Sequence, residues 1–267
     1  MEIKEILERV REGKMDLQTA ESLLAGTKLL RLSGGIVQFD LHRESRSGIP
    51  EVVYAESKTP ETCKLIAENI LKEKPAVMFT RLKEKQLKVL EVLVSNPENE
   101  IDGDIQEDAR LVLLWRRGFI PKNHGGKVGI ITAGTSDIPV AKEAEAVLRL
   151  MGSTVIATYD VGIAGLHRLF KPLKECLEEE VDVLIVIAGM EGALPSVVAG
   201  LVDIPVIGVP VSTGYGFGSG GMTALSSMLQ SCSPGLAVVN IDSGFAAGAF
   251  AALISQKCSA IRNKNTL

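Results

Sequence analysis

A lone acid, Glu191, directly follows the apolar run 183–188 (VLIVIA) and two linking residues. A short apolar run of this kind predicts a parallel strand that is covered on both faces. Open α/β sheets bind their ligands just beyond the carboxyl ends of such strands, so a carboxylate here is a candidate general base. We therefore expect the neighbouring loop residues Gly189, Met190 and Gly192 to contact a ligand.

Two earlier loops carry polar side chains that suit a nucleotide. Ser136 and Asp137 precede a helix that opens with Pro139. A helix N-terminus flanked by hydroxyl groups favours phosphate, and the same side chains would also serve as plain helix caps. His167 and Arg168 follow the next predicted strand; the imidazole can transfer protons near neutral pH, and the guanidinium can pair with a carboxylate or phosphate. Ordinary surface is the alternative interpretation of this pair.

A glycine-rich stretch follows the fourth predicted strand of this half. Gly216, Gly218 and Gly221 form a literal G-x-G-x-x-G, and Asp242 ends a later strand. This pattern is the dinucleotide-binding fingerprint, so an NAD-dependent dehydrogenase is an alternative function. Against it, residues 212–215, including Gly214, separate the first glycine from its strand. A flexible lid over a site, or a nucleotide-binding regulatory subunit without catalysis, would also fit so many glycines.

The four cysteines show no paired spacing. None of Cys63, Cys176, Cys232 and Cys258 belongs to a CxxC motif, and there are only three histidines, which argues against a disulfide framework and a structural zinc site. Cys232 differs from the others because it lies in the turn SCSPG, between a predicted helix and a predicted strand. It is either a small turn residue or a nucleophile.

Composition limits the partners and the location. The chain has 267 residues, a net charge of −4 and a pI near 5.6, and it has no run of lysine and arginine interleaved with aromatic residues. Nucleic acid is therefore not an expected partner. The N-terminus is charged and helix-periodic, and no apolar run approaches the roughly 20 residues of a membrane span. We expect a cytoplasmic protein with no membrane contact.

The pattern of elements predicts two domains, 1–124 and 125–267. The first is a small α+β domain behind a helical lead-in. Its predicted helices cover 3–11, 16–24 and 59–73, its predicted strands cover 36–41, 51–56, 76–80 and 88–94, and an acidic turn-rich stretch (96–109) and a helix-like stretch (111–119) lead to a linker at 121–126.

The second domain alternates strands and helices regularly. The predicted strands cover 127–133, 154–160, 183–188, 205–211 and 237–241, and the predicted helices cover 138–151 and 166–180, begin at 196, cover 222–230 and begin at 245. Alternation at this spacing predicts right-handed crossovers and a three-layer α/β/α domain with a parallel sheet. The loops described above would then gather at the carboxyl edge of that sheet.

The order of these loops resembles the aminoimidazole ribonucleotide carboxylase fold of purine synthesis. The resemblance covers residues 127–211 and rests on Ser136-Asp137, His167-Arg168, the Leu-Pro loop 189–195 and the strand 205–211 (PVIGVPV). In the purine enzyme a histidine precedes the Leu-Pro, whereas here that position is Ala193 and Glu191 stands in the same loop. The purine substrate also needs no cysteine nucleophile.

With these departures the chain is similar to a sister family, the carboxylase/hydrolase called LarB that begins synthesis of the nickel-pincer nucleotide cofactor. Four segments carry this resemblance: TSDIP, DVGIAGLHR, AGMEGALPS and NID. The family's N-terminal motif, which the purine carboxylases lack, is matched by Asp40, Arg43, Arg46, Gly48, Pro50, Glu51 and Lys58. The likeness extends over nearly the whole chain.

The resemblance implies that nicotinic acid adenine dinucleotide is carboxylated on its pyridinium ring and hydrolysed at its phosphoanhydride. The products would be pyridinium-3,5-biscarboxylic acid mononucleotide and AMP. Carbon dioxide or bicarbonate would be the co-substrate, no cofactor would be tightly bound, and a magnesium ion is a candidate helper for the hydrolysis. No metal-ligating residue is assigned. A homo-oligomer is expected, both from the resemblance and from the small residues between 244 and 252, for which internal helix packing is the alternative.

The resemblance also assigns roles to the side chains. Cys232 matches the family's nucleophile, whose thiolate would add to the electron-poor ring, and Glu191 is our choice of base for the ring proton. Because Cys232 follows the negative end of a helix, a cation such as His167 or Arg168 would have to favour its thiolate. Ser136, Asp137 and the glycine loop with Gly214 and Gly216 would hold ribose and phosphates, together with the N-terminal motif.

Overall fold

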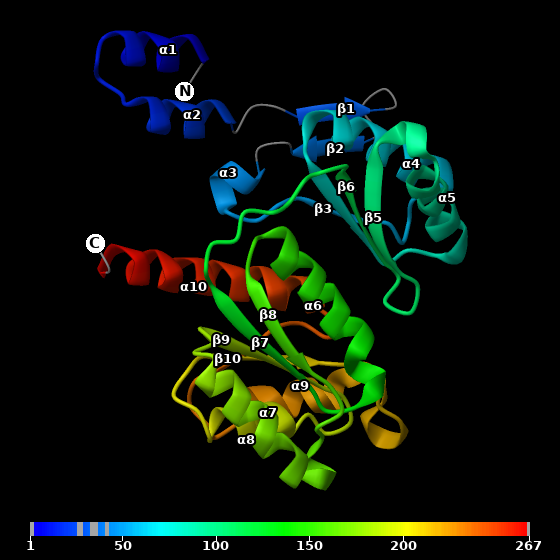
Figure 1. Cartoon of the computed structure of the whole chain (residues 1–267). Helices are drawn as coiled ribbons and strands as arrows, with labels where there is room; N and C mark the ends of the chain where they lie inside the picture. Colours follow the sequence, from blue (N-terminus) through cyan, green and yellow to red (C-terminus); the bar gives the residue numbers. More distant parts are fainter. Residues whose placement is uncertain (1–2, 26–28, 33–36, 41–42, 266–267) are drawn as a thin grey trace. The chain divides into compact units, whose positions relative to one another are not determined.

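The computed structural model describes residues 3–25, 29–32, 37–40 and 43–265 (Figure 1). The chain divides into two compact units. Unit 1 comprises Met1–Ile105 and Leu111–Phe119, and unit 2 comprises Gln106–Arg110 and Ile120–Leu267.

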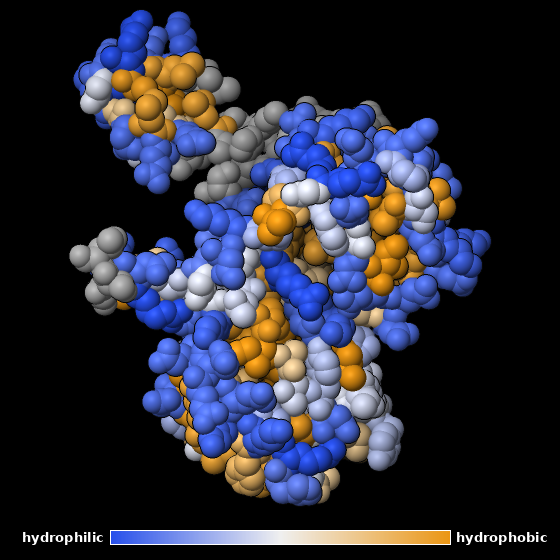
Figure 2. All heavy atoms as spheres, viewed as in Figure 1, coloured by the Kyte–Doolittle hydropathy of each residue, from blue (hydrophilic) through white to orange (hydrophobic). Residues whose placement is uncertain are grey.

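Unit 1 is an α+β unit built on a four-stranded sheet of order β3-β4-β6-β5. Its elements are α1 (Ile3–Arg11), α2 (Leu17–Ala25), β1 (Leu29–Leu32), β2 (Val37–Asp40), α3 (Arg43–Ser47), β3 (Val52–Tyr54), α4 (Pro60–Glu73), β4 (Ala76–Thr80), α5 (Glu84–Ser95), β5 (Ile101–Gln106) and β6 (Leu111–Arg116). Buried residues of α4, α5, β4 and β6 share one core. Apolar atoms are exposed over α1 and α2 (Figure 2).

Two predictions for unit 1 are wrong. Residues 88–94, predicted as a strand, belong to helix α5, because Leu87, Leu90 and Leu93 form one buried helical face while Val92 points to solvent. In the segment 111–119, predicted as helix-like, Leu111–Arg116 form β6, whose first four residues are all buried and so show no alternation. Short apolar runs fit either element until their packing partners are known.

The acidic stretch 96–109 is also more ordered than the turn-rich segment that we predicted. It contains β5, which lies at the edge of the sheet next to β6. Helix α4, by contrast, begins where the sequence predicts. The Thr59 side chain accepts a hydrogen bond from the Thr62 N–H, and Pro60 occupies the first turn, where its missing N–H costs nothing.

Unit 2 confirms the predicted α/β architecture with five parallel strands. Its elements are β7 (Lys127–Thr132), α6 (Ile138–Leu150), β8 (Thr154–Thr158), α7 (His167–Glu178), β9 (Val183–Ala188), α8 (Leu194–Ala199), β10 (Val206–Pro210), α9 (Met222–Leu229), β11 (Leu236–Val238) and α10 (Gly244–Asn265). Helices α6 and α10 cover one face of the sheet, and α7, α8 and α9 pack into one core on the other. The result is the three-layer sandwich (Figure 1).

The strand order of unit 2 is β11-β10-β9-β7-β8, and each pair of neighbouring strands is parallel. Counted along the chain from β7, this is the doubly wound order 2-1-3-4-5. The direction in which the strand–helix–strand connections cross the sheet reverses between β7 and β9, the first and third strands along the chain. Connections leave these two strands toward opposite faces, so a crevice opens between their carboxyl ends.

Small residues of α10 allow it to pack closely against α6 within the same unit, which is the alternative to an oligomer contact. A Cβ on Gly244 would collide with the Val140 carbonyl, and a Cβ on Gly248 would collide with Val147, both on α6. By length and hydropathy, 244–264 is a candidate membrane span, which we did not expect, but 44% of its apolar window is buried inside the structure. We take α10 as a core helix of unit 2.

Candidate active site

A pocket of about 260 Å³ lies at the carboxyl edge of the sheet, where the loops after β7, β8, β9 and β10 converge. It occupies the β7–β9 switch point, the position at which doubly wound sheets bind ligands. The lining residues are Ala133, Gly134, Ser136, Asp137, Gly162, Ile163, Ala164, Ala188, Gly189, Met190, Glu191, Ala193, Leu194, Thr213 and Tyr215. Four predicted site residues, Ser136, Asp137, Gly189 and Met190, thus share one pocket with Glu191.

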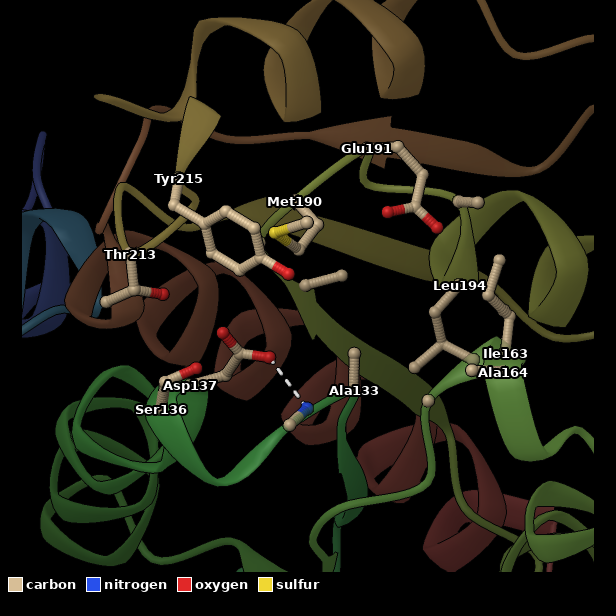
Figure 3. Close-up of a pocket in the computed structure, with 15 residues that line it drawn as sticks. Ala133, Ser136, Asp137, Ile163, Ala164, Met190, Glu191, Leu194, Thr213 and Tyr215 are labelled. Carbon is tan, nitrogen blue, oxygen red and sulfur yellow. Dashed lines mark hydrogen bonds between the residues drawn. The ribbon is translucent and has the colours of Figure 1, made fainter. Parts of the chain in front are cut away.

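The polar side of the pocket is built around Asp137 (Figure 3). This side chain is buried; its Oδ2 accepts a hydrogen bond of 2.9 Å from the Gly134 N–H, and its Oδ1 has no hydrogen-bond partner among the described residues. Burial raises the pKa of Asp137, although the nearby Gly134 amide and Thr213 hydroxyl act in the opposite direction. A buried acceptor without a partner is costly, so the Asp137 carboxyl carries an unmet demand for a hydrogen-bond donor on this side of the pocket.

Glu191 lies on the other side of the pocket, with its carboxylate beside the apolar wall that includes Leu194 and Ile163 (Figure 3). The loop holds it there by two left-handed residues, Met190 (φ +49°) and Gly192 (φ +66°). A Cβ on Gly192 would lie 2.7 Å from the Ala224 carbonyl oxygen, so only glycine fits this turn. Gly192 therefore shapes the loop. We predict from the sequence that Gly192 contacts the ligand, but it does not line the pocket.

The loop after β10 supplies two lining residues, Thr213 and Tyr215, which lie in the predicted glycine loop 212–221 but were not individually predicted as site residues. Its first N–H, that of Ser212, donates to Asp242 Oδ1 at 2.9 Å, and the Asp242 N–H donates to the Pro210 carbonyl at 2.9 Å. Gly214 packs on the Glu191 loop, since its Cβ would lie 3.3 Å from the Met190 nitrogen. The sequence pattern could have identified both residues, because they follow a predicted strand.

The dinucleotide fingerprint does not fit this topology. Its glycines follow β10, the fourth strand of the sheet, and not the first strand beside the switch point. The Asp242 carboxylate, which would hold a ribose in that motif, instead accepts the Ser212 N–H. Gly216, with a φ of +67°, belongs to the turn before α9 and does not line the pocket.

His167 and Arg168 begin helix α7 and are exposed. Arg168 pairs with Asp160 at 3.2 Å, and the pocket is lined from this loop by Gly162, Ile163 and Ala164 instead. No lysine, arginine or histidine is among the described residues that line the pocket. A phosphate group therefore has no cationic partner inside it.

Cys232 lies at the opposite edge of the sheet from Glu191. The turn that contains it precedes β11, and the Gly235 carbonyl accepts the N–H of Val206, the first residue of β10. Glu191 follows the far end of β9, so the paired length of β9 and β10, five residues or about 16 Å, separates the two edges. Cys232 is exposed, and the neighbouring Ser233 hydroxyl donates to the Ser196 carbonyl of α8.

The predicted N-terminal site residues lie in unit 1, where one ion pair and one backbone hydrogen bond join three of them. Arg46 pairs with Asp40, and the Asp40 N–H donates to the Glu51 carboxylate. Burial raises the pKa of Glu51, although Arg43 and Arg46 lie close enough to lower it. Lys58 lies in the turn after β3, where its carbonyl and that of Ala55 accept from the buried Gln86 amide.

Within the described residues no three side chains of histidine, cysteine, aspartate or glutamate gather closely enough to hold a metal ion. The two pocket carboxylates, Asp137 and Glu191, stand on opposite sides (Figure 3). This donor set does not suit magnesium, which prefers a compact octahedron of oxygen ligands. No catalytic role is therefore assigned to a metal ion in this pocket.

Two family models match the chain. One is described as AIR carboxylase and matches residues 127–266, and the other is described as LarB/PurE-like N-terminal domain and matches residues 32–116. An uncharacterized protein of Methanocaldococcus jannaschii is 47% identical over 220 residues, which are 82% of this chain and 84% of that protein.

Curated enzymes match about half of the chain. The N5-carboxyaminoimidazole ribonucleotide mutase of Thermotoga maritima is 36% identical over 135 residues, which are 48% of this chain and 74% of the mutase. Among solved structures, a Treponema denticola PurE2 variant has 21% identity and a TM-score of 0.37, over 53% of this chain and 93% of that chain.

Proposed function

Because the chain belongs to the AIR carboxylase family and carries a LarB/PurE-like N-terminal domain, we propose that it carboxylates the pyridinium ring of nicotinic acid adenine dinucleotide and hydrolyses its phosphoanhydride. The observation that carries this proposal is Glu191, the carboxylate that stands beside an apolar wall in the switch-point pocket. The products are pyridinium-3,5-biscarboxylic acid mononucleotide and AMP, and carbon dioxide is the second substrate.

The volume of the pocket supports a binding mode in which only part of the substrate lies inside it. Its volume of about 260 Å³ lies just below the range of about 300–1,000 Å³ for ligand pockets, so it suits a ring and a ribose better than a whole dinucleotide. The exposed Ser136 and Thr213 hydroxyls suit the ribose hydroxyls. The apolar wall of Ile163 and Leu194 suits the flat ring, and the phosphates then lie outside the pocket.

The proposed chemistry uses two protein groups. The Cys232 thiolate adds to a ring carbon of the pyridinium, and this gives a neutral dihydropyridine with a nucleophilic enamine carbon. That carbon forms the new bond to carbon dioxide, after which Glu191 removes the proton from the same carbon. The carbon–sulfur bond then breaks, its electron pair leaves with the thiolate, and the pyridinium is restored with one additional carboxylate.

This route requires Cys232 of a second copy of the chain. In one copy the thiol and the Glu191 pocket lie at opposite edges of the sheet, about 16 Å apart along the strands. Large apolar side chains near the pocket edge are exposed, as expected for a face that another copy covers: Met190, Phe217 and Met222. We therefore propose a homo-oligomer in which neighbouring copies complete each other's sites.

Mass spectrometry tests the function directly. Purified protein is incubated with nicotinic acid adenine dinucleotide and with ¹³C-bicarbonate as the source of carbon dioxide. The expected products are AMP and a mononucleotide that carries one ¹³C carboxylate. The Cys232→Ala variant is expected to make no labelled mononucleotide, with Cys258→Ala as the matched control. Wild-type protein that releases no labelled mononucleotide contradicts the proposal, and equal product from Cys232→Ala contradicts the covalent route.

A further inference from the structure

Tyr215 is a large aromatic side chain that lines the pocket and yet remains 77% exposed. Its ring reaches toward the centre of the pocket with the hydroxyl toward Asp137, and Glu191 stands on the opposite side, with Met190 between them (Figure 3). One face of an aromatic ring is therefore available to a ligand. An exposed aromatic surface of this kind is favourable only once something covers it.

The backbone around Tyr215 is held on both sides. Before it, the Ser212 N–H is bound by Asp242, and Gly214 lies so close to the neighbouring loop that its Cβ would be 3.3 Å from the Met190 nitrogen and 3.1 Å from the Gly218 carbonyl oxygen. After it, residues 216–221 form a tight turn into α9. The ring thus has a defined place above the pocket.

The electrostatic character of the pocket indicates what the ring covers. Asp137 and Glu191 are the charged residues among those that line it, and both are acids. The face of a tyrosine ring is also negative, and it attracts cations within about 6 Å of its centre. The apolar contacts of Ile163 and Leu194 favour a flat ring. Together these groups favour a flat ring that carries positive charge.

We infer that Tyr215 is a specificity-determining residue that packs on the ring of the ligand and selects a cationic aromatic ring over a neutral ring of the same size. This inference rests on the proposed function in taking a pyridinium as that ring. It goes beyond that function because it assigns the discrimination between oxidised and reduced pyridine nucleotides to one side chain.

Binding to a matched pair of ligands tests the inference. Oxidised and reduced nicotinamide mononucleotide share ribose, phosphate and size, and they differ in the charge of the ring. Calorimetry measures both dissociation constants for the full chain carrying Cys232→Ala, so that covalent addition does not contribute. The preference for the oxidised form is expected to fall about three- to thirtyfold in Tyr215→Leu and to persist in Tyr215→Phe, which keeps the aromatic face.

The outcomes separate this inference from the proposed function. An unchanged preference in Tyr215→Leu overturns the inference even when wild-type protein makes the carboxylated product. The inference is also overturned if Tyr215→Leu changes the oligomeric state on size-exclusion chromatography but leaves the preference for the oxidised form unchanged. Loss of preference in Tyr215→Leu without any turnover by wild-type protein supports the inference and contradicts the function. Failure of the Cys232→Ala chain to bind either mononucleotide overturns the inference.

Discussion

The buried Asp137 carboxyl lowers the stability of the fold, and we expect it to contribute to ligand affinity. Burial raises the pKa of this carboxyl above the value of 3.8 for an exposed aspartate, so its ionised form destabilises the fold once the pH rises through the folded-state pKa. We expect Asp137→Asn to raise the melting temperature at pH 7, and the gain to disappear below about pH 3.8, where the carboxyl is protonated in both states.

Ligand affinity should change in the opposite direction. The asparagine carbonyl can keep the Gly134 hydrogen bond, but its amide then presents a donor where Asp137 Oδ1 presents an acceptor. Calorimetric unfolding at the two pH values and mononucleotide titration check both effects, with the exposed Asp203→Asn as control. A variant that is both less stable at pH 7 and unaltered in binding would contradict this account.

Glu191 is exposed at the pocket, where the proposed mechanism uses it as the base. Glu191→Gln keeps the size and removes the basic oxygen, so we expect carboxylation to slow by roughly 10²–10⁴-fold while substrate affinity changes little. Single-turnover kinetics and equilibrium binding separate the two quantities. Comparable losses in both would assign Glu191 to binding and not to proton transfer.

At the scale of elements, the β9–α8 loop shows how backbone conformation places the base. Gly192→Ala forces a Cβ against the Ala224 backbone of α9 at a positive φ, and we expect it to destabilise unit 2 by about 1–3 kcal/mol. Activity should fall further than stability because the loop must move. Gly134→Ala is the control, since its φ is −132° and its Cβ would have no neighbour closer than 3.7 Å. Equal denaturation midpoints for the two variants would exclude this role.

At the scale of the whole molecule, the separation of Cys232 from Glu191 predicts complementation. Chains carrying Cys232→Ala and chains carrying Glu191→Gln are each expected to be inactive. Co-expressed as mixed oligomers, they should regain about a quarter of wild-type activity, because one shared site in four combines the two intact residues. Light scattering verifies the assembly. Mixed oligomers without activity would show that the two residues act within one chain.

The predictability of the fold differs between the two units. In unit 2 each strand is a compact apolar run between polar loops, and local periodicity suffices to locate it. In unit 1, residues 88–94 and 111–119 are apolar runs without alternation, and both predictions are wrong. Whether such a run becomes helix or strand depends on which partner buries it, as Leu90 of α5 and Leu114 of β6 are buried in one core.

Sequence patterns alone indicate that Glu191 follows a buried strand and that Ser136 and Asp137 follow another, because strand ends are local features. Only the tertiary structure decided that these ends share a pocket, since the order of strands depends on pairing between residues far apart in the chain. The same pairing placed Cys232 at the other edge. Thr213 and Tyr215 entered the pocket because Asp242, 30 residues after Ser212, holds their loop in place.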